Sequence, residues 1–137
     1  MHVYEWAVLR VVPRVERCEF VNAGVVVYCR PLDYLAAAVE LDERRLLALD
    51  PGVDLHAVRR HLEAVAALCA GQTAPGVPPD RSPSERFRWL TAPRSTVVQP
   101  SPVHTGLTDD PAAELDDLLR RMVLPLPGVG RTMPTPG

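Results

Sequence analysis

The residues FVNAGVVVYCR at positions 20–30 decide the fold that this sequence predicts. From Val25 to Tyr28 they are unbroken in apolar and aromatic side chains, which is typical of a central strand that is buried on both faces. Gly24 interrupts the beginning of this run. A glycine within a strand indicates either a bulge or a close approach, by backbone or by a ligand. We therefore expect a sheet with residues 20–30 in its interior.

Three further segments resemble strands. Residues 3–12 (VYEWAVLRVV) are mostly apolar on both faces, with Arg10 as the exception, which either reaches solvent at a strand end or points into a cleft. Residues 34–41 are ambiguous in period, and we expect a third strand there because three successive strands make an antiparallel meander. Residues 95–99 (STVVQ) are followed by two prolines, which predicts a short or edge strand.

Start signals mark the expected helices. An aspartate precedes three of them and a Ser-Pro-Ser-Glu capping box with proline at the first helical position begins another. The predicted helices are residues 42–50, which Asp42 opens, residues 55–70 between Asp54 and Gly71, residues 83–90 after Ser82, and residues 111–122 after Asp110.

The sequence therefore predicts an α+β domain over residues 1–123. We expect a small, mainly antiparallel sheet of about four strands, with two or three helices packed on one face. Residues 71–81 are rich in Pro and Gly and predict a mobile surface loop. Residues 124–137 have no core-forming period and predict a disordered Pro/Gly-rich tail.

Composition excludes several chemistries. A chain of 137 residues that is 47% hydrophobic has the size and apolar content of one domain with one core. Its net charge of −2 argues against a constitutive nucleic-acid or membrane binder. All 15 basic residues are Arg, so Schiff-base chemistry and a phosphate-loop Lys are excluded. Any anion site must use Arg, hydroxyls or backbone N–H groups.

The cysteines indicate a reducing compartment. There are three of them, Cys18, Cys29 and Cys69, and no CxxC spacing. Met1 leads directly into a strand-like segment rather than a signal peptide, so we expect a cytoplasmic protein with free thiols. No apolar run approaches the roughly 20 residues that span a bilayer.

No catalytic constellation is specific enough to assign. A Ser/His/Asp triad could be formed by Ser95 or Ser101 with His104 and Asp109, but the G-x-S-x-G motif that would support it is absent. His56 and His61 are not spaced to share one helix face as metal ligands are. We expect no metal and no cofactor, and whether the protein is an enzyme stays open.

The longest run rich in Arg, Ser, Thr, Gln and His that is not of low complexity is residues 87–107, FRWLTAPRSTVVQPSPVHTGL. Arg94, Ser95 and Thr96 combine a forked donor with hydroxyls at a helix-to-strand turn, and His104 follows after a short strand. Such residues either bind an anion or hold down a loop that lacks regular backbone pairing. The candidate ligand-binding residues are Arg10, Asn22, Arg94, Ser95, Gln99 and His104.

Three segments resemble one bacterial family. Residues 4–30, 42–62 and 90–108 are similar to the signature blocks of the family called domain of unknown function 3037. The resemblance implies a small cytoplasmic protein that is often encoded beside a HipA-like kinase. It attaches no catalytic role to the matching polar positions, which are Arg10, Glu16, Asn22, Arg30, Arg94, Ser95, Gln99, Ser101 and His104.

Two functions follow as hypotheses. The first is a non-catalytic accessory or interaction protein, a partner of a HipA-like kinase, that binds through residues 92–106. The alternative is an enzyme or binder acting on a phosphorylated or nucleotide ligand, an anionic small molecule, through an Arg/Ser/His site. Regulatory nucleic-acid binding is a third hypothesis, and the negative net charge of the chain argues against it. Convergence of Arg10, Asn22, Arg94 and His104 in one concave site would favour the ligand reading.

Overall fold

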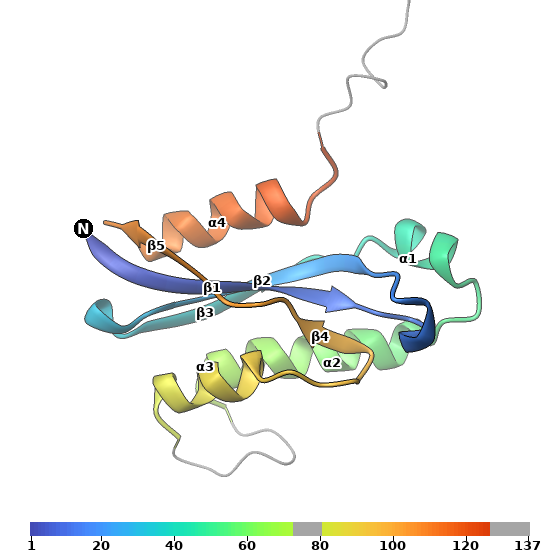
Figure 1. Ribbon diagram of the computed structural model, residues 1–137, viewed down its shortest axis with the longest axis horizontal. Coiled ribbons are helices and arrows are strands. Elements are labelled where there is room, and N and C mark those ends of the chain that lie inside the picture. The colour runs from blue at the N-terminus through green and yellow to red at the C-terminus, as the bar shows by residue number, and fades with distance from the viewer. Residues whose placement is uncertain (73–80, 127–137) are drawn as a thin grey trace, which may run out of the picture.

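The computed structural model describes residues 1–72 and 81–126, and its elements alternate between an open sheet and the helices that cover it (Figure 1). The expected mobility of residues 73–80 and the expected disorder of residues 127–137 fall outside the described residues. The strands are β1 (His2–Val11), β2 (Val21–Cys29), β3 (Tyr34–Val39), β4 (Val98–Pro100) and β5 (His104–Thr108). The helices are α1 (Glu43–Leu49), α2 (Leu55–Cys69), α3 (Pro83–Thr91) and α4 (Pro111–Met122), with short 3₁₀ turns η1 (Val15–Arg17) and η2 (Arg30–Leu32).

The sheet is antiparallel throughout, in the order β3-β2-β1-β4, and β5 also pairs with β1. Strands β4 and β5 occupy successive parts of the same edge of β1: β4 pairs with Leu9–Val11 and β5 with His2–Trp6. The α+β class and the central place of β2 are therefore confirmed. Over residues 1–72 and 81–126 the sheet has five strands rather than about four, and β4 begins three residues later than the predicted strand at 95–99.

The missed strand is β5, whose sequence HTGLT contains a glycine and only one large apolar side chain. That glycine is required by packing rather than by a turn. A Cβ atom on Gly106 would lie 2.7 Å from Cε1 of Tyr4, the residue directly opposite on β1. The Tyr4 ring therefore covers the backbone of β5, and a residue that reads as a strand breaker in the sequence allows the strand to pair.

The interruption of β2 is a bulge, one of the two readings that the sequence allowed. Leu9 pairs with Gly24 while Arg10 pairs with Asn22, which leaves Ala23 as the extra residue. A Cβ atom on Gly24 would lie 2.9 Å from the carbonyl oxygen of Ala38 on β3. The glycine is therefore needed for a close approach of backbone.

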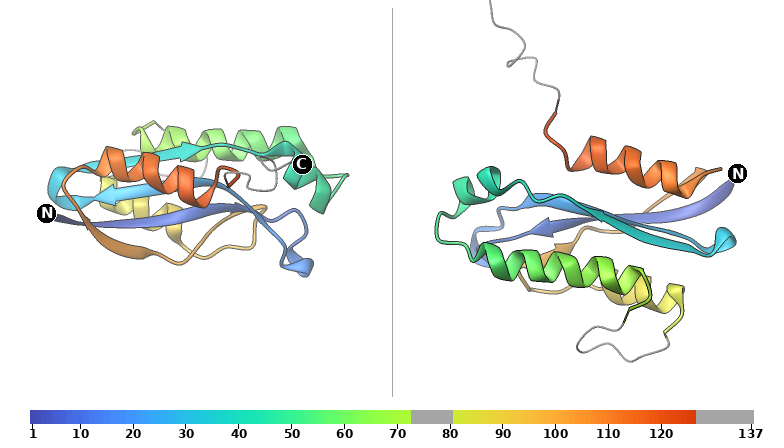
Figure 2. Two further views of the ribbon diagram at one scale, coloured as in Figure 1. Left: turned by 90° about the horizontal axis from the view of Figure 1, so that it is seen from above. Right: turned by 180° about the vertical axis from the view of Figure 1, so that it is seen from behind.

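The helices lie on both faces of the sheet, so the prediction of helices on one face was wrong (Figures 1 and 2). Helix α4 packs on one face, which we call the α4 face, and helices α2 and α3 pack on the other, the α2–α3 face. The reason is in β2 itself. Val25 and Val27 are buried under α4, while Val26 and Tyr28 are buried under α2 and α3. A strand that is apolar on both faces needs cover on both.

The helix starts are confirmed. Asp42, Asp54 and Asp110 each accept a hydrogen bond from the backbone N–H three residues later. Ser82 and Glu85 form the reciprocal capping box. Gly71 has φ +86°, the left-handed conformation expected just beyond the end of α2.

Candidate functional site

Exposed apolar side chains concentrate on residues 89–107, which we call the edge segment because it leads from the end of α3 into the edge strands β4 and β5. The Leu107 side chain is 58% exposed, and Val3, its cross-strand partner on β1, is 56% exposed. The large apolar residues exposed within the segment are Trp89, Val97, Val103 and Leu107. Apolar groups gathered along a sheet edge are typical of a surface that contacts another protein.

Three of the predicted site residues form one row across the sheet. Arg10 on β1 pairs with Asn22 on β2 and with Gln99 on β4, and residues paired in this way point to the same face. Asn22 Nδ2 donates to the carbonyl oxygen of Met122 at the end of α4 (2.9 Å), so the row lies on the α4 face. The Arg10 guanidinium stacks 4.4 Å from the ring centroid of Phe20.

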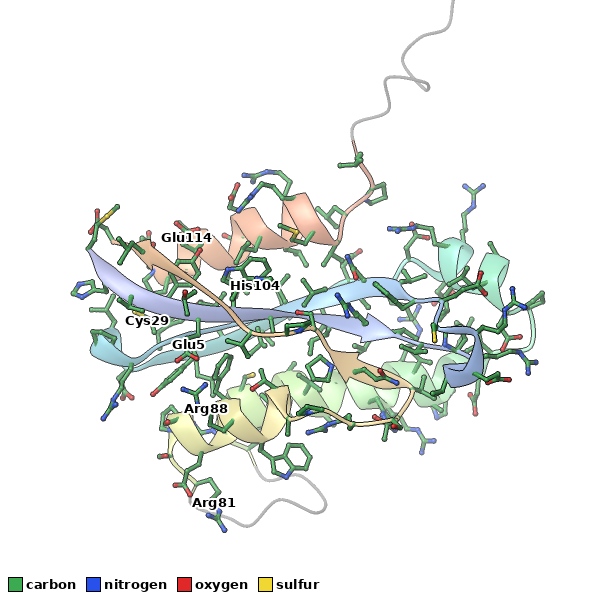
Figure 3. The ribbon with its side chains drawn as sticks, viewed as in Figure 1. Glu5, Cys29, Arg81, Arg88, His104 and Glu114 are labelled. Atoms are coloured by element: carbon green, nitrogen blue, oxygen red, sulfur yellow. The ribbon has the colours of Figure 1, made fainter. Side chains whose placement is uncertain are left out.

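His104 lies on the same face, beside the middle of β1, where it pairs with Trp6 (Figure 3). Its ring stacks on Trp6, with centroids 4.5 Å apart and planes at 27°. Trp6 and Arg10 are four positions apart on β1, a separation of about 13 Å at the usual rise of a strand. Four of the six predicted residues therefore share the α4 face, spread along the strand rather than gathered around one small ligand.

Arg94 belongs to the opposite side of the molecule. Its guanidinium lies over the Trp89 ring, 4.5 Å from the centroid, and Nε donates to the carbonyl oxygen of Ala92 at 3.3 Å. Its Nη2 donates to the carbonyl oxygen of Trp89. These carbonyls end α3, where cations bind favourably. Ser95 beside Arg94 is exposed. The predicted group of Arg94, Ser95 and His104 is therefore not assembled.

A groove of about 420 Å³ lies between α2 and the first part of the edge segment. Apolar side chains of α2, α3 and β4 form its floor, and Arg60, His61 and Arg94 line it with polar groups. Arg60 and His61 were not predicted as site residues: the helical period puts Arg60 on the solvated side of α2, and His61 was considered only as a metal ligand with His56. No signal in the sequence marks them, since the groove exists only where α2 meets residues 89–98.

The remaining family positions are structural or exposed. Ser101 is buried, its Oγ accepts from the Val8 N–H at 2.8 Å and donates to the carbonyl oxygen of Pro102 at 2.9 Å. Glu16 and Arg30 are exposed in turns. The side chain of Gln99 donates to the carbonyl oxygen of Thr96.

The possible catalytic triad of Ser95 or Ser101 with His104 and Asp109 does not form. The Ser101 hydroxyl bonds to backbone, and Asp109 pairs with the Met1 amino group at 3.2 Å. Within residues 1–72 and 81–126 no three His, Cys, Asp or Glu side chains are grouped as metal ligands would be. Over the same residues, every helix is too short or too polar to cross a membrane.

Fold and site together define a small α+β domain with helices on both faces, an apolar sheet edge and an arginine-lined groove beside it. The chain belongs to the family described as Protein of unknown function (DUF3037), whose model matches residues 6–123. The match extends from β1 to the end of α4, which confirms the family resemblance. No curated protein and no solved structure matches the chain.

Proposed function

We propose that the protein is a non-catalytic interaction protein whose partner binds the edge segment. The observation that carries the proposal is the concentration of exposed apolar side chains on residues 89–107, with Arg94 stacked on the exposed Trp89. Trp and Arg are the side chains most often found at the energetic centres of protein interfaces. An edge strand also offers unpaired backbone N–H and C=O groups to a partner.

The scatter of the signature residues supports an interface over a ligand pocket. Arg10, Asn22, Gln99 and His104 lie along the α4 face, whereas Arg94 lies on the α2–α3 side. The alternative proposal, a phosphorylated or nucleotide ligand, would have to bind on one of these two sides, without a joint contribution from Arg10, Arg94 and His104. A protein partner that covers the sheet edge could contact residues on both sides of the sheet, whereas a small molecule in one cavity could not.

The candidate partner is a HipA-like kinase encoded beside the gene, which the family resemblance implies, in a bacterial cytoplasm. We would co-express the two proteins and measure their association by affinity co-purification and calorimetry. The test variants are Val103→Glu with Leu107→Glu, and Arg94→Ala. Val15→Glu is the matched control, because Val15 is a similarly exposed apolar residue in the β1–β2 connection.

The expected result is a stable complex that the two edge variants weaken by at least about tenfold, or 1.4 kcal/mol, and that the control leaves unchanged. Absence of any complex with neighbour-encoded kinases would remove the kinase as partner. A complex that tolerates both edge variants as well as it tolerates the control would contradict binding through the edge segment.

A further inference from the structure

We infer that the groove between α2 and residues 89–98 receives an acidic segment of the partner, with an apolar side chain on the floor and carboxylates at the arginines. The inference rests on the proposed function and names the partner's chemistry. The floor comes from Val65 and Leu68 of α2, Leu90 of α3 and Val98 of β4. The volume of about 420 Å³ falls within the roughly 300–1,000 Å³ typical of ligand pockets.

The charge around the floor has one sign. Arg60 and His61 line the groove from α2, and Arg94 lines it from the opposite wall. The described lining residues include no Asp or Glu, in a chain that carries 17 acidic residues and a net charge of −2. A groove that is cationic within an acidic protein favours anionic groups over neutral and cationic ones.

The arginine on α2 is available to a ligand. Arg59, its neighbour in sequence, forms an ion pair with Glu43. Arg60 is exposed and has no carboxylate within ion-pair distance among residues 1–72 and 81–126. The Arg60 guanidinium therefore keeps its five N–H donors for a carboxylate, for which its forked geometry is suited.

The opposite wall is rigid before any partner binds. Stacking on Trp89 and hydrogen bonds to the carbonyl oxygens of Trp89 and Ala92 fix the Arg94 side chain. A side chain that is already ordered loses little conformational entropy when it binds. Trp89 is itself 40% exposed, so an apolar group entering the groove would also cover its ring.

A peptide segment fits these features better than a small anion. Phosphate or acetate would use the arginines but leave the apolar floor and the Trp89 ring in water. A carboxylate-bearing segment with an apolar anchor uses both, and the groove is lined by Thr96 and Val98 of the edge segment itself. Nucleic acid would repeat one phosphate per nucleotide, whereas the groove presents two guanidinium groups on opposite walls.

The test is a selection from a random-peptide display library on the intact protein, followed by synthesis of the enriched peptides. We expect Glu or Asp next to a large apolar residue, and affinity that falls at raised salt concentration. Replacing their Glu and Asp by Gln and Asn should weaken binding by about tenfold. Arg60→Glu should weaken it at least as much, Arg60→Lys less, and Arg59→Glu is the matched control on the same helix.

Arg94→Gln tests the contribution of Arg94 on the opposite wall of the groove. If this substitution disturbs the end of α3, Arg60→Glu still tests peptide binding by itself. Enriched peptides without acidic residues, or indifferent to Arg60→Glu, would overturn the inference, as would no enrichment. So would displacement of the peptides by inorganic phosphate alone or by a short DNA duplex at equal charge concentration. Arg94 belongs to both tests, so two other variants separate them: loss of the complex on Val103→Glu with Leu107→Glu tests the proposed function, and loss of peptide binding on Arg60→Glu tests the groove.

Discussion

Ser101 lies between two prolines at the junction of β4 and β5, where neither proline has an N–H for the sheet. Its own N–H donates to the carbonyl oxygen of Val8, and its Oγ accepts from the Val8 N–H, both at 2.8 Å. The Ser101 Oγ thus accepts the Val8 N–H in the place of a backbone carbonyl oxygen. This explains why a serine matched by the family resemblance is buried rather than presented to a ligand.

Ser101→Ala is therefore expected to destabilise the protein by about 1–3 kcal/mol, because it leaves the buried Val8 N–H unpaired. Urea denaturation followed by circular dichroism measures the change. Ser95→Ala is the control, since Ser95 is exposed and should stay within about 0.5 kcal/mol of the wild type. Equal effects of the two substitutions would contradict the assigned role of Ser101.

The three thiols should differ in reactivity. Cys18 is exposed, whereas Cys29 and Cys69 are buried, and burial raises the pKa of the Cys69 thiol to about 12. A thiol reagent at pH 8 should therefore label Cys18 in the native protein and the other two only after denaturation. Mass spectrometry of the labelled chain checks this, and rapid labelling of Cys69 in the native state would contradict its burial at the end of α2, against the sheet and α3.

At the scale of elements, α3 depends on its capping box. The Ser82 Oγ accepts from the Glu85 N–H, and Glu85 accepts from the Ser82 N–H, each at 3.2 Å. Ser82→Ala should cost about 1 kcal/mol. Ser84→Ala is the control, because Ser84 lies two residues further along in α3 and does not belong to the capping box.

The effect of the cap should also depend on pH. Hydrogen bonds from Arg81 and then from Ser82 lower the pKa of the Glu85 carboxyl. A group whose pKa is lowered on folding stabilises the fold above its unfolded pKa, about 4.3 for Glu, and loses that contribution as the pH falls. The difference between wild type and Ser82→Ala should therefore shrink between pH 7 and pH 3. A difference that grows on acidification would contradict this coupling.

At the scale of the whole molecule, the sheet is held from both sides. Leu118 of α4 is 1% exposed and packs on one face, and Phe87 of α3 is fully buried on the other. Leu118→Ala should cost about 2–5 kcal/mol in chemical denaturation, because Leu118 is buried among the residues through which α4 packs on the sheet. Asp116→Ala, exposed on the same helix, is the control. A cost below about 1 kcal/mol for Leu118→Ala would mean that α4 is only loosely docked.

The positions of most helices and strands could be predicted because the sequence patterns that mark them involve neighbouring residues. A cap joins residues three positions apart, and the bulge at Gly24 is marked by the glycine itself. The candidate site was less readable. The alternation of β1 puts Trp6 and Arg10 on one face, but no local pattern shows that Arg94 and Trp89 lie beside α2, on the opposite side of the sheet from His104.

Patterns in the chain were enough to predict the α+β class, the family, the boundaries of most helices and the central place of β2. Three features became visible only in the folded molecule: helices cover both faces, β5 pairs with β1, and α2 and residues 89–98 enclose a groove lined by Arg60 and Arg94. These features rest on interactions between distant parts of the chain. The bond from Asn22 to Met122 joins residues 100 positions apart, and that from Val8 to Ser101 joins residues 93 apart. Such contacts depend on how the whole chain packs, which no single segment encodes.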